Sequence, residues 1–303
     1  MPNGSIVGQM TELQRIGQPV DRDGEDQRIG AILVSMGALT PDQVERILAV
    51  QEKDTKARFG EIAIRLGFVK KKHVDSALAK QFGYSGDLTE VNQLLSPSLV
   101  AALNPVSPFA EALRGLRSQL LVRWFDGTPA QIAMAITSVN RGDGKSFITS
   151  NLGVIFSQLG ERTLIIDADL RHSTQHEIFG LRNRMGLSGV LNQRAGAEEI
   201  IQIPGLAGLS VLPAGPVPPN PTELLSRDGF AILLNQLSSH FDVILIDTPS
   251  AQEASDALVV ASRARGVTIV GRRDSTKSSE LTQLASVLRG GGCTIIGATL
   301  NDY

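Results

Sequence analysis

The spacing of apolar residues changes along this 303-residue chain and divides it into two parts. Between residues 28 and 90 they recur three or four positions apart, as they do on the buried face of a helix. Beyond residue 108, short apolar runs alternate with longer helical stretches. The runs predict strands at residues 131–137, 163–167, 209–212, 243–247, 267–270 and 294–300. This alternation is typical of a mainly parallel sheet covered by helices on both faces.

An internal repeat organises the first part. The segment 28–37, RIGAILVSMG, is echoed thirty positions later by RFGEIAIRLG at 58–67. The match continues through apolar helix positions and a closing glutamine, in Val44, Leu48 and Gln51 and again in Val74, Leu78 and Gln81. Each unit is predicted to form two short helices joined by a turn at Gly37 or Gly67. Because one unit cannot bury its apolar face alone, the pair should stack into a small domain.

The pattern predicts four segments along the chain. Residues 1–27 lack periodicity and are expected to form a flexible tail, and residues 28–90 form the tandem-repeat domain. Residues 91–108, punctuated by prolines, are expected to be a linker, and residues 109–303 form an α/β domain.

Composition narrows the function classes. The 29 Lys and Arg residues against 31 Asp and Glu give a net charge of −2, so no overall basic field attracts nucleic acid. A single cysteine, Cys293, excludes an intramolecular disulfide and a cysteine-cluster metal site. We find neither a secretion signal nor 18 consecutive uncharged apolar residues, and therefore expect a cytoplasmic protein without a membrane span.

A phosphate-binding loop is predicted at residues 138–146, SVNRGDGKS, between a strand and a helix. Gly142 and Gly144 would let backbone N–H groups turn inward around phosphate oxygens, where the helix N-terminus adds partial positive charge. Lys145 would reach the terminal phosphates, and the Ser146 hydroxyl would bind Mg²⁺. The alternative is a glycine turn with an exposed lysine.

Aspartates end two other predicted strands. Asp167 and Asp169, two positions apart, would point to the same side, and Asp247 ends the strand at 243–247. Because Mg²⁺ takes few protein ligands and keeps its waters, Ser146, Asp169 and Asp247 are the candidate metal ligands. Asp167 is the candidate for accepting the proton of an attacking hydroxyl. The alternative for each aspartate is a helix cap or a solvated loop residue.

These motifs carry a family resemblance. TSVNRGDGKS at 137–146, LIIDADLRH at 164–172 and VILIDTP at 243–249 resemble the Walker A, Walker A′ and Walker B motifs of the bacterial tyrosine kinases, in particular the EpsG-type chain-length-determinant kinases. The resemblance implies ATP and Mg²⁺ as cofactors. It implies catalytic roles for Lys145, Asp167 and Asp169, and a nucleotide-binding set of Gly142, Asp143, Gly144, Lys145, Ser146, Phe147 and Arg171. For Arg171 a structural salt bridge is an equal alternative.

The resemblance also implies an assembly. Glu111, Arg114 and Arg117 share one helical face, a pattern that packs subunits of this family into a ring. The alternative is a solvated face with a weak internal ion pair. Tyr303 is the candidate acceptor for autophosphorylation. The expected partners are further copies of the chain and a membrane-anchored polysaccharide co-polymerase that activates it at the inner membrane; no nucleic-acid partner is expected.

The tandem repeat resembles the MshEN-like N-terminal domain of type II secretion and pilus-assembly ATPases, whose units can bind cyclic di-GMP. Arg28 and Arg58 match arginines that hold phosphate or stack on guanine, while Gly30 and Gly60 would permit close approach of the backbone. The alternative is a purely structural or partner-docking module.

The sequence therefore predicts a P-loop NTPase of the α/β class, preceded by a small, mostly helical tandem-repeat domain. The expected activity is ATP-dependent tyrosine autophosphorylation that regulates exopolysaccharide chain length and export. The alternative is a nucleotide-switched P-loop ATPase or adaptor without kinase activity, whose repeat domain binds cyclic di-GMP or a partner protein.

Overall fold

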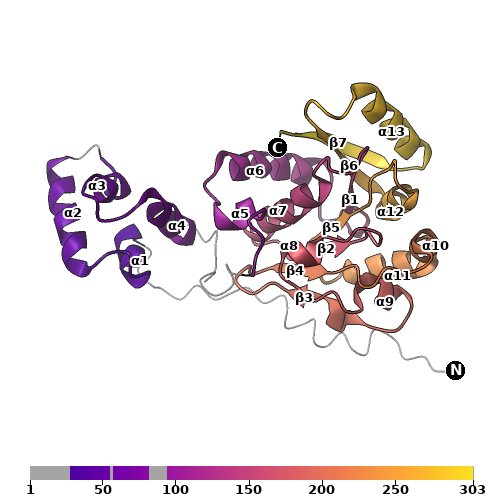
Figure 1. The fold of residues 1–303 in the computed structure, drawn as a ribbon, viewed down its shortest axis with the longest axis horizontal. Coiled ribbons are helices and arrows are strands. Elements are labelled where there is room, and N and C mark those ends of the chain that lie inside the picture. Colours follow the sequence, from indigo (N-terminus) through magenta and orange to yellow (C-terminus); the bar gives the residue numbers. More distant parts are fainter. Residues whose placement is uncertain (1–27, 55–56, 82–93, 303) are drawn as a thin grey trace.

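The computed structural model describes residues 28–54, 57–81 and 94–302 (Figure 1). The tail predicted at residues 1–27 lies outside this part, as do both tyrosines of the chain, Tyr84 and Tyr303. The described residues form a helical group before residue 82 and an α/β group after residue 93, each with apolar cores of its own. None of the described helices is long and apolar enough to cross a membrane.

The helical group contains the two predicted helix pairs. Its helices are α1 (Ile29–Ser35), α2 (Pro41–Lys53), α3 (Phe59–Arg65) and α4 (Lys71–Gln81). The predicted turns are confirmed at Gly37 and Gly67, whose φ angles of 66° and 70° lie in the left-handed region that glycine adopts without strain. At the start of α2, the Thr40 hydroxyl accepts a hydrogen bond from the Gln43 N–H.

Helices pack closely at the glycines at positions 30 and 60. A Cβ atom on Gly60 would lie 2.5 Å from Val74 Cγ1 in α4, and one on Gly30 would lie 3.2 Å from Phe59 Cζ in α3. Both glycines are buried within the helical group. Close contact between helices thus accounts for these glycines, for which the sequence had suggested the approach of a ligand.

Seven strands form one sheet in the order β3-β4-β2-β5-β1-β6-β7 (Figure 1). Their bounds are β1 Ala133–Ser138, β2 Thr163–Asp167, β3 Ile201–Gln202, β4 Leu209–Leu212, β5 Val243–Asp247, β6 Gly266–Arg272 and β7 Thr294–Asn301. All neighbouring strands are parallel except β3, which runs antiparallel to β4 at the edge. Every predicted strand is present, and the predicted fold class is confirmed; β3 is too short for the apolar pattern to indicate.

Helices cover both faces of the sheet. One face carries α5 (Val100–Leu103), α6 (Pro108–Arg123) and α7 (Lys145–Ser157). The other carries α9 (Gly186–Leu191), α10 (Pro221–Ser226), α11 (Asp228–Leu237), α12 (Asp256–Ala264) and α13 (Ser278–Gly290), while α8 (Gln175–Ile178) follows β2. Alternate residues of β2 enter the two cores, with Leu164 and Ile166 on the second face and Ile165 on the first. The sheet is therefore buried on both sides, as parallel sheets require.

Part of the predicted linker belongs to the core of the α/β group. Leu95 and Leu99 are buried there. The buried Asn151 in α7 holds this segment: its Oδ1 accepts from the Ala101 N–H at 2.8 Å, and its Nδ2 donates to the Ser98 carbonyl at 2.9 Å. Residues 94–103 are thus packed structure, because their apolar side chains and backbone groups find partners on α7.

Replacing Asn151 by alanine tests how firmly this segment is held. The change leaves the Ala101 N–H and the Ser98 carbonyl without their partner, and we expect it to lower the free energy of unfolding by about 3 kcal/mol. Urea denaturation followed by the fluorescence of Trp124, the only tryptophan of the chain and buried in this core, measures the effect. Asn192→Ala removes a partly buried amide-to-carbonyl bond from an exposed residue just after α9, and should cost below about 1 kcal/mol. Equal losses in the two variants would contradict the expectation.

Candidate nucleotide-binding site

Three neighbouring strands bring the predicted site residues to one edge of the sheet. Asp167 at the end of β2 pairs in register with Asp247 at the end of β5, and β5 pairs with β1 on its other side. β1 ends at Ser138, where the phosphate-binding loop begins. Because parallel strands end on the same edge, the loop and both aspartates lie together there.

The loop has the backbone shape that phosphate binding needs. Gly142 and Gly144 have φ angles of 87° and 94°, and Gly144 immediately precedes α7, a helix of 13 residues. The N-terminus of α7 therefore points its free N–H groups and its partial positive charge at the space beside the loop. Lys145 and Ser146 occupy the first turn of this helix.

Residues after β6 and at the end of β7 hold the phosphate loop in place. The carboxylate of the buried Asp143 accepts hydrogen bonds from the Asn140 N–H and the Thr276 hydroxyl, both at 2.9 Å. The Asn301 amide at the end of β7 donates to the Asp143 carbonyl at 3.1 Å. A Cβ atom on Gly144 would lie 2.0 Å from Asn301 Nδ2, so only glycine fits there. Thr276 and Asn301 are distant in sequence, and no motif indicated them.

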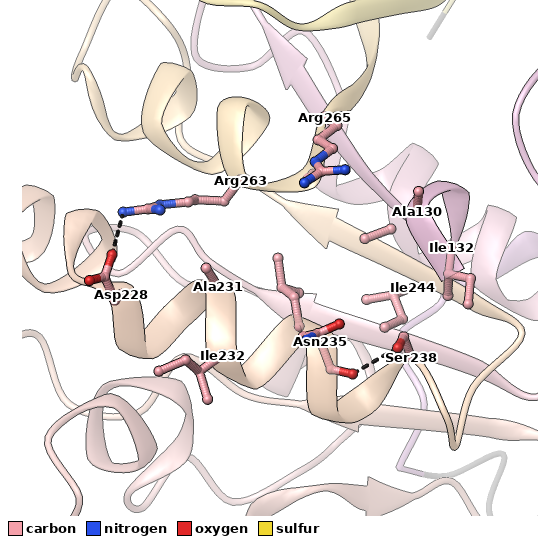
Figure 2. A pocket seen from close by; sticks show the side chains of 13 residues that line it. Ala130, Ile132, Asp228, Ala231, Ile232, Asn235, Ser238, Ile244, Arg263 and Arg265 are labelled. Atoms are coloured by element: carbon pink, nitrogen blue, oxygen red, sulfur yellow. Dashed lines mark hydrogen bonds and ion pairs between the residues drawn. The ribbon is translucent and has the colours of Figure 1, made fainter. Parts of the chain in front are cut away.

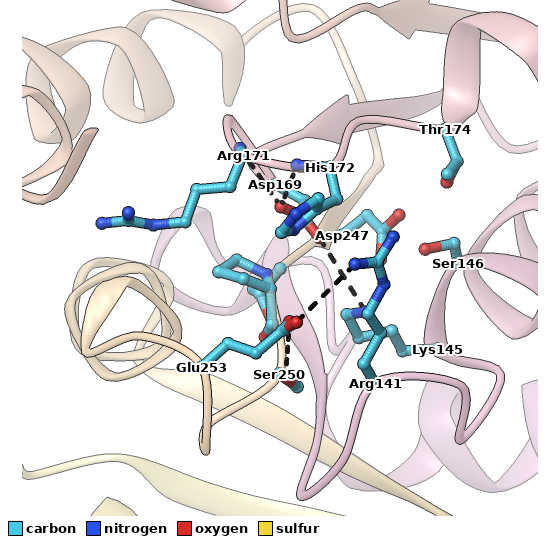
Figure 3. Close-up of polar contacts among 12 residues, drawn as sticks. Arg141, Lys145, Ser146, Asp169, Arg171, His172, Thr174, Asp247, Ser250 and Glu253 are labelled. Atoms are coloured by element: carbon cyan, nitrogen blue, oxygen red, sulfur yellow. Dashed lines mark hydrogen bonds and ion pairs between the residues drawn. The ribbon is translucent and has the colours of Figure 1, made fainter. Parts of the chain in front are cut away.

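Lys145 lies against the Walker A′ aspartates. Its Nζ is 3.9 Å from Asp169 Oδ2, and both side chains are almost completely buried. Asp169 Oδ1 accepts backbone hydrogen bonds from Arg171 and His172, which fixes the carboxylate in place. Figure 3 shows Lys145, Ser146, Asp169 and Asp247 grouped at the loop.

Asp167 organises the segment that follows β2. Its Oδ1 accepts from the Asp169 N–H, and its Oδ2 accepts from the N–H groups of Thr174 and Gln175. The carboxyl is fully buried, and burial together with the Asp247 carboxylate raises its pKa well above the usual range. The structure thus contains the capping contacts of the alternative, and the raised pKa also suits a group that accepts a proton.

Asp247 offers one buried oxygen to a ligand. Its Oδ2 accepts from Gln175 Nε2 at 2.8 Å, while its Oδ1 is buried and accepts no hydrogen bond of normal geometry from any described residue. Burial raises the pKa of Asp247 to about 6, and nearby Lys145, Gln175 and Ser146 counteract this rise. An unpartnered buried carboxylate oxygen costs free energy unless a cation or donor meets it.

These residues fit Mg²⁺ and a nucleotide phosphate. The described residues contain no cluster of three His, Cys, Asp or Glu side chains that could hold a metal alone. Mg²⁺ in phosphoryl-transfer sites needs no such cluster, because phosphate oxygens and waters supply most of its ligands. The open Asp247 Oδ1, the Ser146 hydroxyl and the glycine loop give the donor set that such an ion requires.

Two other members of the predicted nucleotide set make contacts elsewhere. Arg171 points away from Lys145 (Figure 3) and pairs with the buried Asp256 at 2.8 Å, which is the salt bridge of the alternative. Its Nη2 also donates to the Thr222 hydroxyl at 3.2 Å. The Phe147 ring packs against Phe109 of α6, with ring centroids 5.0 Å apart.

The predicted interface residues on α6 are partly engaged within the chain. Arg114 forms an ion pair with Glu111 at 2.9 Å and donates to the Pro105 carbonyl, and its side chain is 15% exposed. Arg117 donates to the Ile155 carbonyl in α7 at 2.8 Å. Glu111 itself is exposed, with 75% of its side chain accessible. The internal ion pair of the alternative is therefore present. Arg117 fastens α6 to α7, and Arg114 holds the segment just before α6.

A second hollow lies at the opposite edge of the sheet. It has a volume of about 570 Å³ between α11 and the end of α12 (Figure 2). Ala133 and Ile244, near the starts of β1 and β5, line it together with Arg263 and Arg265. Because the strands begin here and end at the phosphate loop, this hollow takes no part in the nucleotide site.

Comparison with known proteins identifies the family. No family model matches the chain. The tyrosine-protein kinase YwqD of Bacillus subtilis (strain 168) is 32% identical over 204 residues, which are 67% of this chain and 85% of YwqD. The chain belongs to the bacterial tyrosine-protein kinases. The tyrosine-protein kinase etk of Escherichia coli (strain K12) is 36% identical over 202 residues, 67% of this chain but only 28% of etk.

Solved structures agree with this assignment. The kinase domain of Escherichia coli tyrosine kinase ETK matches with a TM-score of 0.63 and 34% identity, covering 67% of this kinase and 79% of that domain. The chimerical protein CapA2B2 matches with a TM-score of 0.63 and 35% identity, covering 68% of this kinase and 90% of the chimera. Both likenesses concern about two thirds of the chain.

The raised pKa of Asp247 predicts how the stability of the ligand-free kinase depends on pH. Its folded-state pKa of about 6 lies above the usual value of 3.8, so its ionised form is disfavoured by folding. The free energy of unfolding should therefore fall as pH rises from 4 to 6, by up to about 3 kcal/mol from this carboxyl. Asp247→Asn should remove this contribution and be more stable than the wild type at pH 7.5, with the advantage shrinking towards pH 4.

Urea denaturation at several pH values, followed by Trp124 fluorescence, measures this dependence. Asp274→Asn changes an exposed aspartate whose φ of 57° asparagine also tolerates, and its stability should follow the wild type at every pH. A difference between Asp247→Asn and the wild type that stays the same from pH 4 to 7.5 would contradict the expectation.

Proposed function

We propose that this chain is an ATP-dependent protein tyrosine kinase that transfers the γ-phosphoryl group of Mg·ATP to a tyrosine hydroxyl, including a tyrosine of its own. The observation that carries the proposal is the cluster of Lys145, Asp169 and Asp247 beside a left-handed glycine loop at the N-terminus of α7. Phosphoryl transfer depends mainly on positioning and charge neutralisation, and this cluster supplies both.

Each residue then has a definite task. The loop N–H groups and Lys145 neutralise the β- and γ-phosphates, while Gly142 and Gly144 keep the cradle open. Ser146, Asp169 and Asp247 would hold a magnesium ion, which would supply positive charge to neutralise the phosphates. Asp143 contributes through the shape of the loop.

Asp167 is the proposed acceptor for the tyrosine proton. Its carboxylate oxygens offer about four lone-pair sites, and three backbone N–H groups use three of them. The pKa raised by burial makes the carboxylate a better base than an exposed aspartate. The same hydrogen bonds hold the carboxylate in one orientation towards the site.

The proposal also covers the tyrosine acceptor, the contact between subunits and the membrane partner. β7 ends at Asn301, which contacts the phosphate loop and stands two positions before the candidate acceptor Tyr303 in the sequence. We place the ring contact on the exposed Glu111 side of α6, and assign Arg114 and Arg117 the task of holding that helix. We propose a membrane-anchored polysaccharide co-polymerase as activator, and exopolysaccharide export as the process served; the likeness to the chimerical protein CapA2B2 supports this proposal.

Incubation with labelled ATP and Mg²⁺, followed by mass spectrometry, tests the kinase proposal. We expect phosphate on Tyr303 or Tyr84 in the wild type, and a loss of about 100-fold or more in Lys145→Met and in Asp167→Asn, because each removes a charge from the reacting centre. Arg289→Met is the matched control, since Arg289 is exposed in the last turn of α13, outside the phosphate loop and the residues that brace it.

Release of inorganic phosphate without phosphotyrosine, even with the membrane partner added, would contradict the kinase proposal. That result would support the nucleotide-switched ATPase instead. If the chain forms no phosphotyrosine and hydrolyses no ATP in the presence of the partner, both the kinase and the ATPase proposals are wrong.

For the helical group we propose a binding role with cyclic di-GMP as its ligand. Arg28 and Arg58 are exposed and occupy equivalent places, immediately before α1 and α3. Guanidinium groups at helix starts suit phosphate and guanine. Gly30 and Gly60 no longer support this role independently, because packing accounts for them.

Calorimetry of the full chain with cyclic di-GMP tests this role. We expect heat of binding at micromolar ligand, lost in the double variant Arg28→Ala and Arg58→Ala, because the two guanidinium groups supply the contacts to phosphate and base. Arg46→Ala, which removes an exposed arginine from α2, should bind as the wild type does. The absence of heat in the wild type would leave the helical group as a structural or protein-docking module.

A further inference from the structure

One buried glutamine is bonded to all three nucleotide motifs. Gln175 begins α8 and is completely buried. Its backbone N–H donates to Asp167 Oδ2 at 3.0 Å, and its side-chain Nε2 donates to Asp247 Oδ2 at 2.8 Å and to the Ser146 carbonyl at 3.1 Å. Both neighbours of Nε2 are acceptors, so the orientation of the amide is determined by its partners.

These bonds decide which oxygen of Asp247 is available. With Oδ2 held by Gln175, the carboxylate cannot turn without breaking a buried hydrogen bond. Oδ1 is then the remaining oxygen, buried and without a normal hydrogen bond from the described residues. The second bond of Nε2 fixes the first turn of α7, which carries the Ser146 hydroxyl. Two of the three proposed magnesium ligands, Asp247 and Ser146, are thus set relative to each other by one amide group.

We propose that Gln175 is a positioning residue for magnesium: it holds Asp247 and the Ser146 turn so that Asp247 Oδ1 and the Ser146 hydroxyl face the ion together. This inference rests on the proposed Mg·ATP site and deepens it. Partners that orient a metal ligand from behind control metal affinity without touching the metal.

A purely structural glutamine would not look like this one. Its Oε1 is buried and has no hydrogen-bond partner among the described residues. Leaving such an acceptor unpaired costs about 1–3 kcal/mol, a cost that the bonds from Nε2 to Asp247 and Ser146 do not remove. A magnesium ion keeps several of its waters, and their hydrogens are suited to meet an acceptor in this position.

Titrating Mg²⁺ against the binding of a fluorescent ATP analogue tests the proposal on the full chain. Gln175→Met keeps the length of the side chain and removes both donors, and Gln175→Glu keeps the shape but sets a carboxylate against Asp247. In both variants we expect the Mg²⁺ midpoint to rise by about 10- to 100-fold. Binding of the analogue in EDTA should stay within about twofold of the wild type, since the phosphate loop itself is unchanged.

Gln158→Met is the matched control. Gln158 lies at the far end of α7, where its Nε2 donates to the Ala101 carbonyl at 3.1 Å. Replacing it removes a glutamine-to-carbonyl bond of similar length but should leave the Mg²⁺ midpoint unchanged. Thermal unfolding of each variant distinguishes loss of the fold from loss of metal binding. The Mg²⁺ midpoint is interpreted only for a Gln175 variant that still unfolds in a cooperative transition.

Two results would overturn the inference. The first is a Mg²⁺ midpoint within about twofold of the wild type in a folded Gln175 variant. The second is an equal loss of binding in EDTA and in Mg²⁺, which would show that Gln175 only shapes the phosphate loop. The kinase proposal can fail separately. If the wild type binds the analogue in a Mg²⁺-dependent way but forms no phosphotyrosine, only the kinase proposal is contradicted.

Discussion

Burial of three carboxylates at one edge of the sheet is the constraint on which the site depends. Asp167, Asp169 and Asp247 are almost fully buried, and Lys145 lies beside Asp169 as a counter-charge. Charges in such a place are tolerated only when donors surround them. Backbone N–H groups of the segment after β2 and the amide of Gln175 supply those donors. Burial raises the pKa values of Asp167 and Asp247 in spite of these donors, and a cation bound here would favour their ionised forms.

Contacts from two groups of elements hold the edge of the sheet where the phosphate loop lies. Thr276 and Asn301, from the segments after β6 and at the end of β7, hold the phosphate loop through Asp143. On the other side, the ion pair between Arg171 and Asp256 joins the Walker A′ segment to the start of α12. A nucleotide bound here would therefore contact a rigid frame, which lowers the entropic cost of ordering the site at the moment of reaction.

Local patterns made much of this predictable. Every strand of four residues or more was predicted, because apolar runs between turn signals are typical of strands buried on both faces. The glycine turns of the repeat, the loop from Ser138 to Ser146 and the three aspartates also followed from spacing. The segment at 94–103 was expected to be a linker, since its prolines resemble loop punctuation. Its burial depends on Asn151, about fifty residues away, whose bonds no local pattern shows.

The sequence by itself determined the mainly parallel α/β fold, the helix pairs and the position of the phosphate loop and its acidic partners, because these follow from periodicity and from residue types at short spacing. Only the tertiary structure decided which oxygens and donors meet. Gln175 facing Asp247, Asn301 against Gly144, and Arg171 bound to Asp256 all join residues that are distant along the chain. Which groups form hydrogen bonds depends on which strand ends lie close together, and that is determined by the assembly of the whole sheet.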